Sequence, residues 1–209
     1  MDKTDMTYEA TRDLLMAGPS LVFAGNLEDY HRLLQEMTAR FGGTQSPQAA
    51  EQVLKFSLIV PTDAATLRAL DPVANVARKS METERVTPGN NFLLAWRAFA
   101  LALFEYRAGH FDEAVAMARK CLGFPDTRPT AIAMAHLVMG MALRQLHREA
   151  EAQSEIRAGE AMVRSKIPID ASIPPQIWGN DQTGYWYDWV LARILLHEAE
   201  ALIEADPKK

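Results

Sequence analysis

The sequence is short of the residues on which many metal and redox sites are built. Its 209 residues include one cysteine, Cys121, and five histidines. A single cysteine excludes an internal disulfide and any metal site made of several cysteines. The histidines lie in different segments with no pairing at four-residue spacing: His31, His110, His136, His147 and His197. We therefore predict no metal site and no cofactor.

Positive charge is neither in excess nor clustered. The chain carries 27 acidic and 22 basic side chains, a net charge of −5, and the basic residues are interspersed with acidic ones along every segment. Affinity for nucleic acid comes largely from clustered cations that displace counterions from phosphate. We predict a protein or peptide partner and no nucleic acid.

A segment typical of a signal peptide is also missing. The nearest to a signal-peptide core is LLMAGPSLVFAG (14–25), which follows four acidic residues where a secreted precursor carries net positive charge. Gly18 and Pro19 interrupt this run, and it is too short to cross a membrane. We therefore expect a cytoplasmic protein with no membrane partner.

The alternation of apolar and polar residues that marks a strand is absent. Apolar residues instead recur at spacings of three and four, and the good helix formers dominate. The pattern predicts an all-α fold of about nine helices in a single domain, 1–209. The expected elements are helical hairpins over about 7–41, 47–82, 92–122 and 129–165, a loop over 166–184, and a last helix over 185–204.

Residues that commonly start or end helices support these boundaries. Asn26 and Ser46 are suited to begin helices as N-caps, Pro61 to stop the helix that starts at Pro47, and Asp63 to open the next one. We expect the first helix to be interrupted at Gly18–Pro19 and the helix over 62–82 to bend near Pro72. A loop is expected over 83–91.

The stretch FEYRAGHFDEAVAMARKCL (104–122) has the features of a helical hairpin. A glycine and an aromatic, Gly109 and Phe111, divide two helix-forming halves, and the small residues Ala118 and Cys121 follow in the second half. It resembles the turn and second helix of a tetratricopeptide repeat. Small side chains at a helix crossing let two backbones approach closely while larger ones fill the gaps between hairpins.

The same layout returns in MGMALRQLHREAEAQSEIRAG (139–159), where Gly140, Ala152 and Gly159 take the small positions and His147 the turn. AGNLEDYHRLL (24–34) looks like a third turn. The resemblance implies a right-handed stack of antiparallel hairpins, a tetratricopeptide-like α-α superhelix, whose last helix caps the open end.

A longer resemblance covers most of the chain. The order YHRLLQEMTARFG, LKFSLIVP, YRAGHFDEA and WYDWVLARILLHEAEALI is similar to the tetratricopeptide-type tail found downstream of serine/threonine kinase and propeller modules in some bacteria. This implies a non-catalytic interaction or regulatory module in signalling. The chain itself has no Gly-rich phosphate loop, His-Arg-Asp loop or Asp-Phe-Gly.

Individual candidates for catalysis do not form a convergent set. HEAEA (197–201) lacks the second histidine of the zinc-protease motif, because Ala201 stands in its place. Cys121 is expected to pack as the small residue of the repeat. We therefore predict no enzymatic activity and no catalytic residues.

The first helices of the two clearest hairpins are predicted to line a concave groove. Apolar residues with an aromatic and an arginine are typical of binding hot spots. The proposed partner-binding residues are Trp96, Phe99, Leu103, Tyr106, Met134, Leu137, Met141 and Arg144. The alternative is that residues 47–82 and the last helix fill the groove, which would make these side chains part of the core.

Two other functions stay open. The aromatic cluster WGNDQTGYWYDW (178–189) suggests a second surface at Trp178 and Trp186, and an enzyme or small-ligand site could lie under the 166–184 loop. A carboxylate or histidine pair with perturbed pKa values in a pocket beneath that loop would favour the enzyme. The other alternative is a structural module that forms a homodimer through exposed apolar helix faces.

Overall fold

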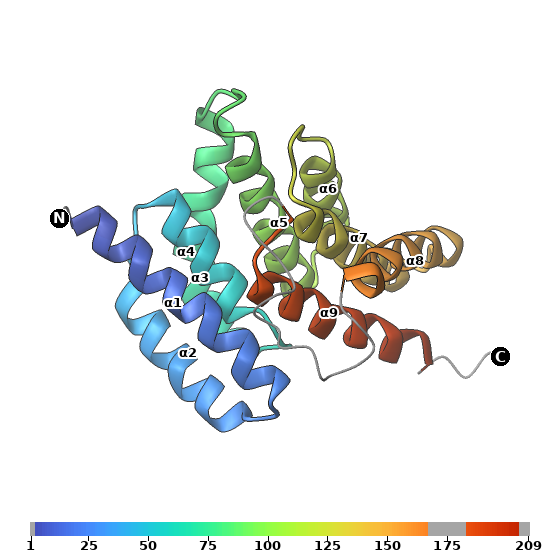
Figure 1. Cartoon of the computed structure of the whole chain (residues 1–209), viewed down its shortest axis with the longest axis horizontal. Coiled ribbons are helices and arrows are strands. Elements are labelled where there is room, and N and C mark those ends of the chain that lie inside the picture. The colour runs from blue at the N-terminus through green and yellow to red at the C-terminus, as the bar shows by residue number, and fades with distance from the viewer. Residues whose placement is uncertain (1–2, 167–182, 205–209) are drawn as a thin grey trace.

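The computed structural model of the chain describes residues 3–166 and 183–204. Every regular element in these two ranges is an α-helix, which confirms the all-α prediction (Figure 1). The nine helices of this part are α1 (Lys3–Phe23), α2 (Leu27–Phe41), α3 (Pro47–Ser57), α4 (Ala64–Thr83), α5 (Asn91–Ala108), α6 (Phe111–Leu122), α7 (Pro129–Gln145), α8 (Glu149–Lys166) and α9 (Trp186–Glu204).

Helix starts follow the local sequence. Asn26, Ser46 and Asp63 each accept a hydrogen bond from the backbone N–H three residues later, at the starts of α2, α3 and α4. These contacts satisfy N–H groups that have no partner inside the helix. Helix α3 ends at Ser57, earlier than the expected stop at Pro61.

One predicted break is absent. Helix α1 runs through Gly18 and Pro19. Helix α4 is a single helix that contains Pro72, as expected. Gly18 lies against α3 so closely that a Cβ there would be 2.6 Å from the ring of Phe56. Tertiary packing therefore holds a helix that the local sequence alone disfavours.

The turns α5–α6 and α7–α8 are equivalent. Gly109 and His147 both adopt the left-handed conformation, with φ of 81° and 58°. In each turn the N–H of the next residue donates to the carbonyl five residues earlier, at 2.9 Å. These bonds satisfy the last carbonyls of the first helix, so the second hairpin repeats the turn of the first.

Two glycines allow the closest helix pair. A Cβ on Gly140 of α7 would lie 2.5 Å from Ile156 of α8, and one on Gly159 would lie 2.7 Å from the side chain of Leu137 and 2.9 Å from the carbonyl oxygen of Ala133. The small residues expected at the crossing are therefore where two backbones meet.

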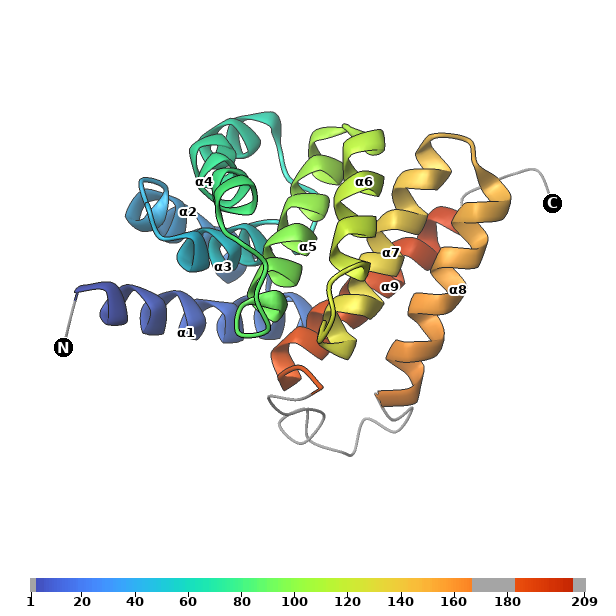
Figure 2. The same ribbon diagram turned by 90° about the horizontal axis from the view of Figure 1, so that it is seen from above.

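The hairpins lie side by side. Helices α1, α3, α5 and α7 contact one another in that order and form what we call the inner row, while α2, α4, α6 and α8 are their hairpin partners. Figure 2 shows the hairpins α5–α6 and α7–α8 next to each other, with α9 crossing them.

The last helix does not simply cap the end of the stack. Helix α9 contacts α1 at one side of the inner row and α7 and α8 at the other. Its buried residues include Tyr187, Trp189, Val190, Leu195 and Leu196. A helix that is apolar on several sides needs neighbours on several sides, so α9 lies across the inner row.

The glycine contact gives a first test. Gly159→Ala should lower the free energy of unfolding by about 1–3 kcal/mol, because the added methyl meets a backbone carbonyl that cannot rotate away. Urea denaturation measures the loss. Gly43→Ala is the control, since nothing lies within 4 Å of a Cβ at Gly43. Equal stability of the two variants would show that α7 and α8 do not pack this closely.

Candidate functional site

The predicted groove is filled. Its five central side chains, Phe99, Leu103, Met134, Leu137 and Met141, are all completely buried. The prediction that they line an open binding groove is therefore wrong, and the alternative that residues 47–82 and the last helix fill it is supported. The reason is that α3 and α4 contact α5, while α9, which was expected only at the end of the stack, contacts α7.

The other three predicted groove residues lie where the inner row meets α9 or α3. Tyr106 donates a long hydrogen bond, 3.5 Å, to Glu198 of α9. Arg144 donates from Nε to the carbonyl oxygen of Leu202 near the end of α9, at 3.0 Å. The half-buried Trp96 makes a cation–π contact with the buried Lys55 of α3. All three stabilise the closed arrangement.

The second predicted surface is described only in part. Trp178 lies outside the described residues. Trp186 is half-buried against the core and makes an edge-to-face contact with Tyr187, with ring centroids 5.7 Å apart. Among the described residues of the cluster, 183–189, Tyr185 is the exposed one, at 47%.

A buried ionic cluster joins α3 to the start of α9. The ammonium of Lys55 lies 2.7 Å from the carboxylate of Glu51 and 3.4 Å from that of Asp188. It also lies 3.9 Å from the ring centroid of Trp96 on α5. The three ionic side chains are each less than a tenth exposed. We call Glu51, Lys55, Asp188 and Trp96 the Lys55 cluster.

Burial and the neighbouring charges act in opposite directions on each pKa of this cluster. Loss of solvation raises the pKa of Glu51 and of Asp188, and the nearby Lys55 only partly opposes this rise. Burial lowers the pKa of Lys55, but the two carboxylates outweigh it and the net direction is upward. The cluster therefore holds one cation between two carboxylates whose pKa values are both raised.

The cluster also has a local structural role. Asp188 accepts a hydrogen bond from the backbone N–H of Tyr185 at 3.3 Å, as a capping residue in the first turn of α9. Sequence reasoning missed the cluster. The only local signal was the spacing of four between Glu51 and Lys55, which is typical of a solvent-exposed ion pair.

A second buried contact fixes the other half of α9. Arg107 of α5 forms a two-pronged ion pair with Glu198 and also donates to the carbonyl oxygens of Leu58 and Ile59, at 3.1 and 3.2 Å. Planar pairing of this kind fixes orientation as well as distance. It holds the α3–α4 loop against α9.

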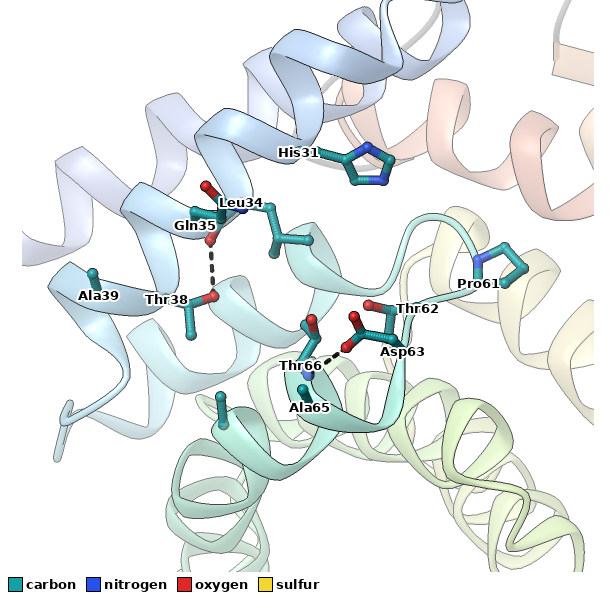
Figure 3. A pocket seen from close by; sticks show the side chains of 11 residues that line it. His31, Leu34, Gln35, Thr38, Ala39, Pro61, Thr62, Asp63, Ala65 and Thr66 are labelled. Carbon is teal, nitrogen blue, oxygen red and sulfur yellow. Dashed lines mark hydrogen bonds between the residues drawn. The ribbon is translucent and has the colours of Figure 1, made fainter.

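An open cleft of about 790 Å³ lies between α2 and α4 (Figure 3). Gln35 and Thr38 come from α2, Thr66 from α4, and Pro61 and Thr62 from the loop between α3 and α4. Its floor includes the buried Leu34. We call this space the α2–α4 cleft.

A second cleft of about 490 Å³ begins on the other side of the same loop. Pro61 and Thr62 line it too, together with Tyr106, Phe111 and Leu202 near the ends of α5, α6 and α9. We call it the α9-end cleft. Because the two clefts share the Pro61–Thr62 wall, they adjoin along the edge where the hairpins turn.

The remaining chemical candidates have structural environments. Burial raises the pKa of Cys121 to about 12, so its thiol stays protonated and unreactive. His110 and His136 each pair with one glutamate, Glu105 and Glu155. In the described ranges no three histidine, cysteine or acidic side chains gather as a metal site would require.

The surface of the described part offers few large apolar side chains. Phe23 and Leu27 flank the α1–α2 turn, and Val86 and Tyr185 are exposed elsewhere. The predicted homodimer is not tested by these positions and stays a prediction.

Among the described helices, none combines the length and apolar character needed to cross a bilayer.

The Lys55 cluster predicts a pH-dependent defect. Lys55→Met should cost about 3–5 kcal/mol at neutral pH, because it leaves two buried carboxylates without a cation. Carboxylates whose folded pKa is raised bind protons in the folded state, so the loss should be smallest near pH 4 and grow as pH rises above it. Urea denaturation across this range measures it. Lys79→Met, at an exposed lysine of α4, should change stability little, and an equally small, pH-independent effect at Lys55 would contradict the cluster.

The filled groove gives a second prediction. Trp96→Ala together with Tyr106→Ala should cause a large fall in melting temperature, since truncating a packed core aromatic costs about 3–5 kcal/mol. Phe23→Ala, at a half-exposed aromatic, is the control. A double variant that melts like this control would show that these side chains face solvent and that the groove is open.

Comparison with known proteins assigns no family. The chain matches no protein-family model, no curated protein and no solved structure. The evidence for its function is therefore the arrangement of its clefts and buried contacts.

Proposed function

We propose that this chain is a non-catalytic interaction module that binds a protein or peptide partner. The observation that carries this proposal is the pair of adjoining open clefts on either side of Pro61 and Thr62. Clefts of this size, with an apolar floor and a few polar side chains, are the usual form of a ligand site. The partner surface proposed from the sequence moves from the filled inner face to these clefts.

The hairpin architecture supports the same class of function. The matching turns at Gly109 and His147 and the close crossing at Gly140 and Gly159 agree with the resemblance to tetratricopeptide repeats. Repeat modules of this kind use extended surfaces to bind their partners. The resemblance to a tail of bacterial signalling proteins is part of this proposal.

A second candidate is an enzyme that uses Glu51 or Asp188 for proton transfer. The raised pKa values of these carboxylates favour it, since perturbed acids gather at catalytic sites. Against it, both side chains are closed to solvent and already hold structural contacts with Lys55 and the start of α9. Structural ion clusters shift pKa values in the same way.

A peptide selection tests the proposal. We expect that panning random linear peptides displayed on phage against the whole protein yields sequences that bind as synthetic peptides in isothermal titration calorimetry. A single helical module with clefts of this size should give micromolar dissociation constants, about −8 kcal/mol. Binding should leave the helical content unchanged, because the clefts are already formed.

Two results would contradict the proposal. One is that no selected peptide binds in solution. The other is that the protein turns over a member of a general panel of ester and glycoside substrates, and that Asp188→Asn abolishes this turnover. The control Glu200→Gln, at a carboxylate on the exposed side of α9, should then retain it. That second result would establish the enzyme instead.

A further inference from the structure

The two clefts adjoin at one loop. Pro61 and Thr62 line both of them, so this loop is the ridge between the two spaces. We call the two clefts together the trough. A ligand that occupies both halves has to be a chain that crosses the ridge, whereas a compact molecule would occupy one half only.

The side chains along the trough are mostly uncharged. Gln35 and Thr38 stand on the α2 wall and Thr66 on the opposite α4 wall, with Thr62 on the ridge (Figure 3). Amide and hydroxyl groups on facing walls can donate to and accept from the N–H and C=O groups of an extended backbone. Apolar contact is available from Leu34 on one side of the ridge.

The trough carries few charged groups, and each of its two carboxylates holds a structural contact. Asp63 holds the backbone N–H of Thr66 at 2.7 Å as the N-cap of α4, and this contact lowers its pKa. In the α9-end cleft, Glu198 is neutralised by Arg107. Asp63 keeps its negative charge in the α2–α4 cleft, because a hydrogen bond from a backbone N–H does not neutralise a carboxylate. The ion pair in the α9-end cleft offers a charged ligand no free partner, and an uncharged segment would disturb neither contact.

The ridge is held in place before any ligand arrives. Arg107 donates to the carbonyl oxygens of Leu58 and Ile59, just before the ridge, and the ring of Pro61 fixes the backbone there. A site that needs no ordering on binding loses less entropy when a ligand binds.

We infer that the trough binds an extended peptide segment of low charge, lying across Pro61 and Thr62 with its backbone between the walls of α2 and α4 and an apolar side chain against Phe111 and Leu202. This inference rests on the proposed function and adds the site and the class of peptide to it.

Long side chains placed in each half of the trough test the inference. Ala65→Arg fills the α2–α4 cleft and Ala201→Arg fills the α9-end cleft, because both alanines are exposed lining residues. Ala116→Arg is the matched control, at an exposed alanine of α6 outside both linings. Ala69→Arg, one turn after Ala65 on the same wall, replaces the first variant if that variant does not fold.

The probe is a synthetic copy of a peptide selected on the whole protein. We expect each trough variant to weaken its binding by about tenfold or more, while Ala116→Arg binds as the unmodified chain. The dissociation constant should also change little with added salt, since screening affects charged contacts.

The outcomes separate the two proposals. If the peptide binds and both trough variants bind it normally, the trough inference is overturned and the proposed function stands. If only one of the two trough variants weakens binding, the peptide does not span the ridge and the inference is wrong. The inference is also wrong if the affinity falls steeply with added salt. If no peptide is selected at all, the proposed function itself fails.

Discussion

Helix α9 can lie across the inner row only because its charged side chains find partners there. Asp188 pairs with Lys55 of α3, and Glu198 pairs with Arg107 of α5. Buried ion pairs add little net stability over apolar packing, but an unpaired buried charge is costly. The pairs therefore define one position for α9 by penalising the others.

The position of α9 decides which surfaces remain for binding. Its apolar residues complete the core with Phe99 and Leu103, so the face that stacked hairpins leave concave is occupied from within the chain. Open space remains instead along the edge where hairpins turn, on both sides of Pro61. The same Arg107 that holds Glu198 also holds the loop between these clefts, which links the packing of α9 to the shape of the candidate site.

Much of the fold could be predicted because its signals are local. Spacings of three and four located the helices, cap residues such as Asn26 and Asp63 located their starts, and the glycine and aromatic after α5 located a turn. The exception was α1. Gly18 and Pro19 indicate a break, yet contact with Phe56 keeps the helix continuous.

The candidate site could not be predicted because its signals are not local. An apolar stripe on α5 looks the same whether it faces a partner peptide or α9, and the contact that distinguishes the two joins Lys55 to Asp188, 133 residues away. The clefts depend on the path of one loop and on small exposed residues such as Ala65. Neither feature has a periodic pattern in the sequence.

The most direct test of this account is amide hydrogen exchange, measured residue by residue on the intact chain. If α9 is part of the core, amides of residues 191–196 should exchange with the same free energy as those in the middle of α5 and α7, through global unfolding. If α9 only caps the end of the stack, its amides should exchange at clearly lower free energy while α5 and α7 stay protected. That result would contradict the filled inner face.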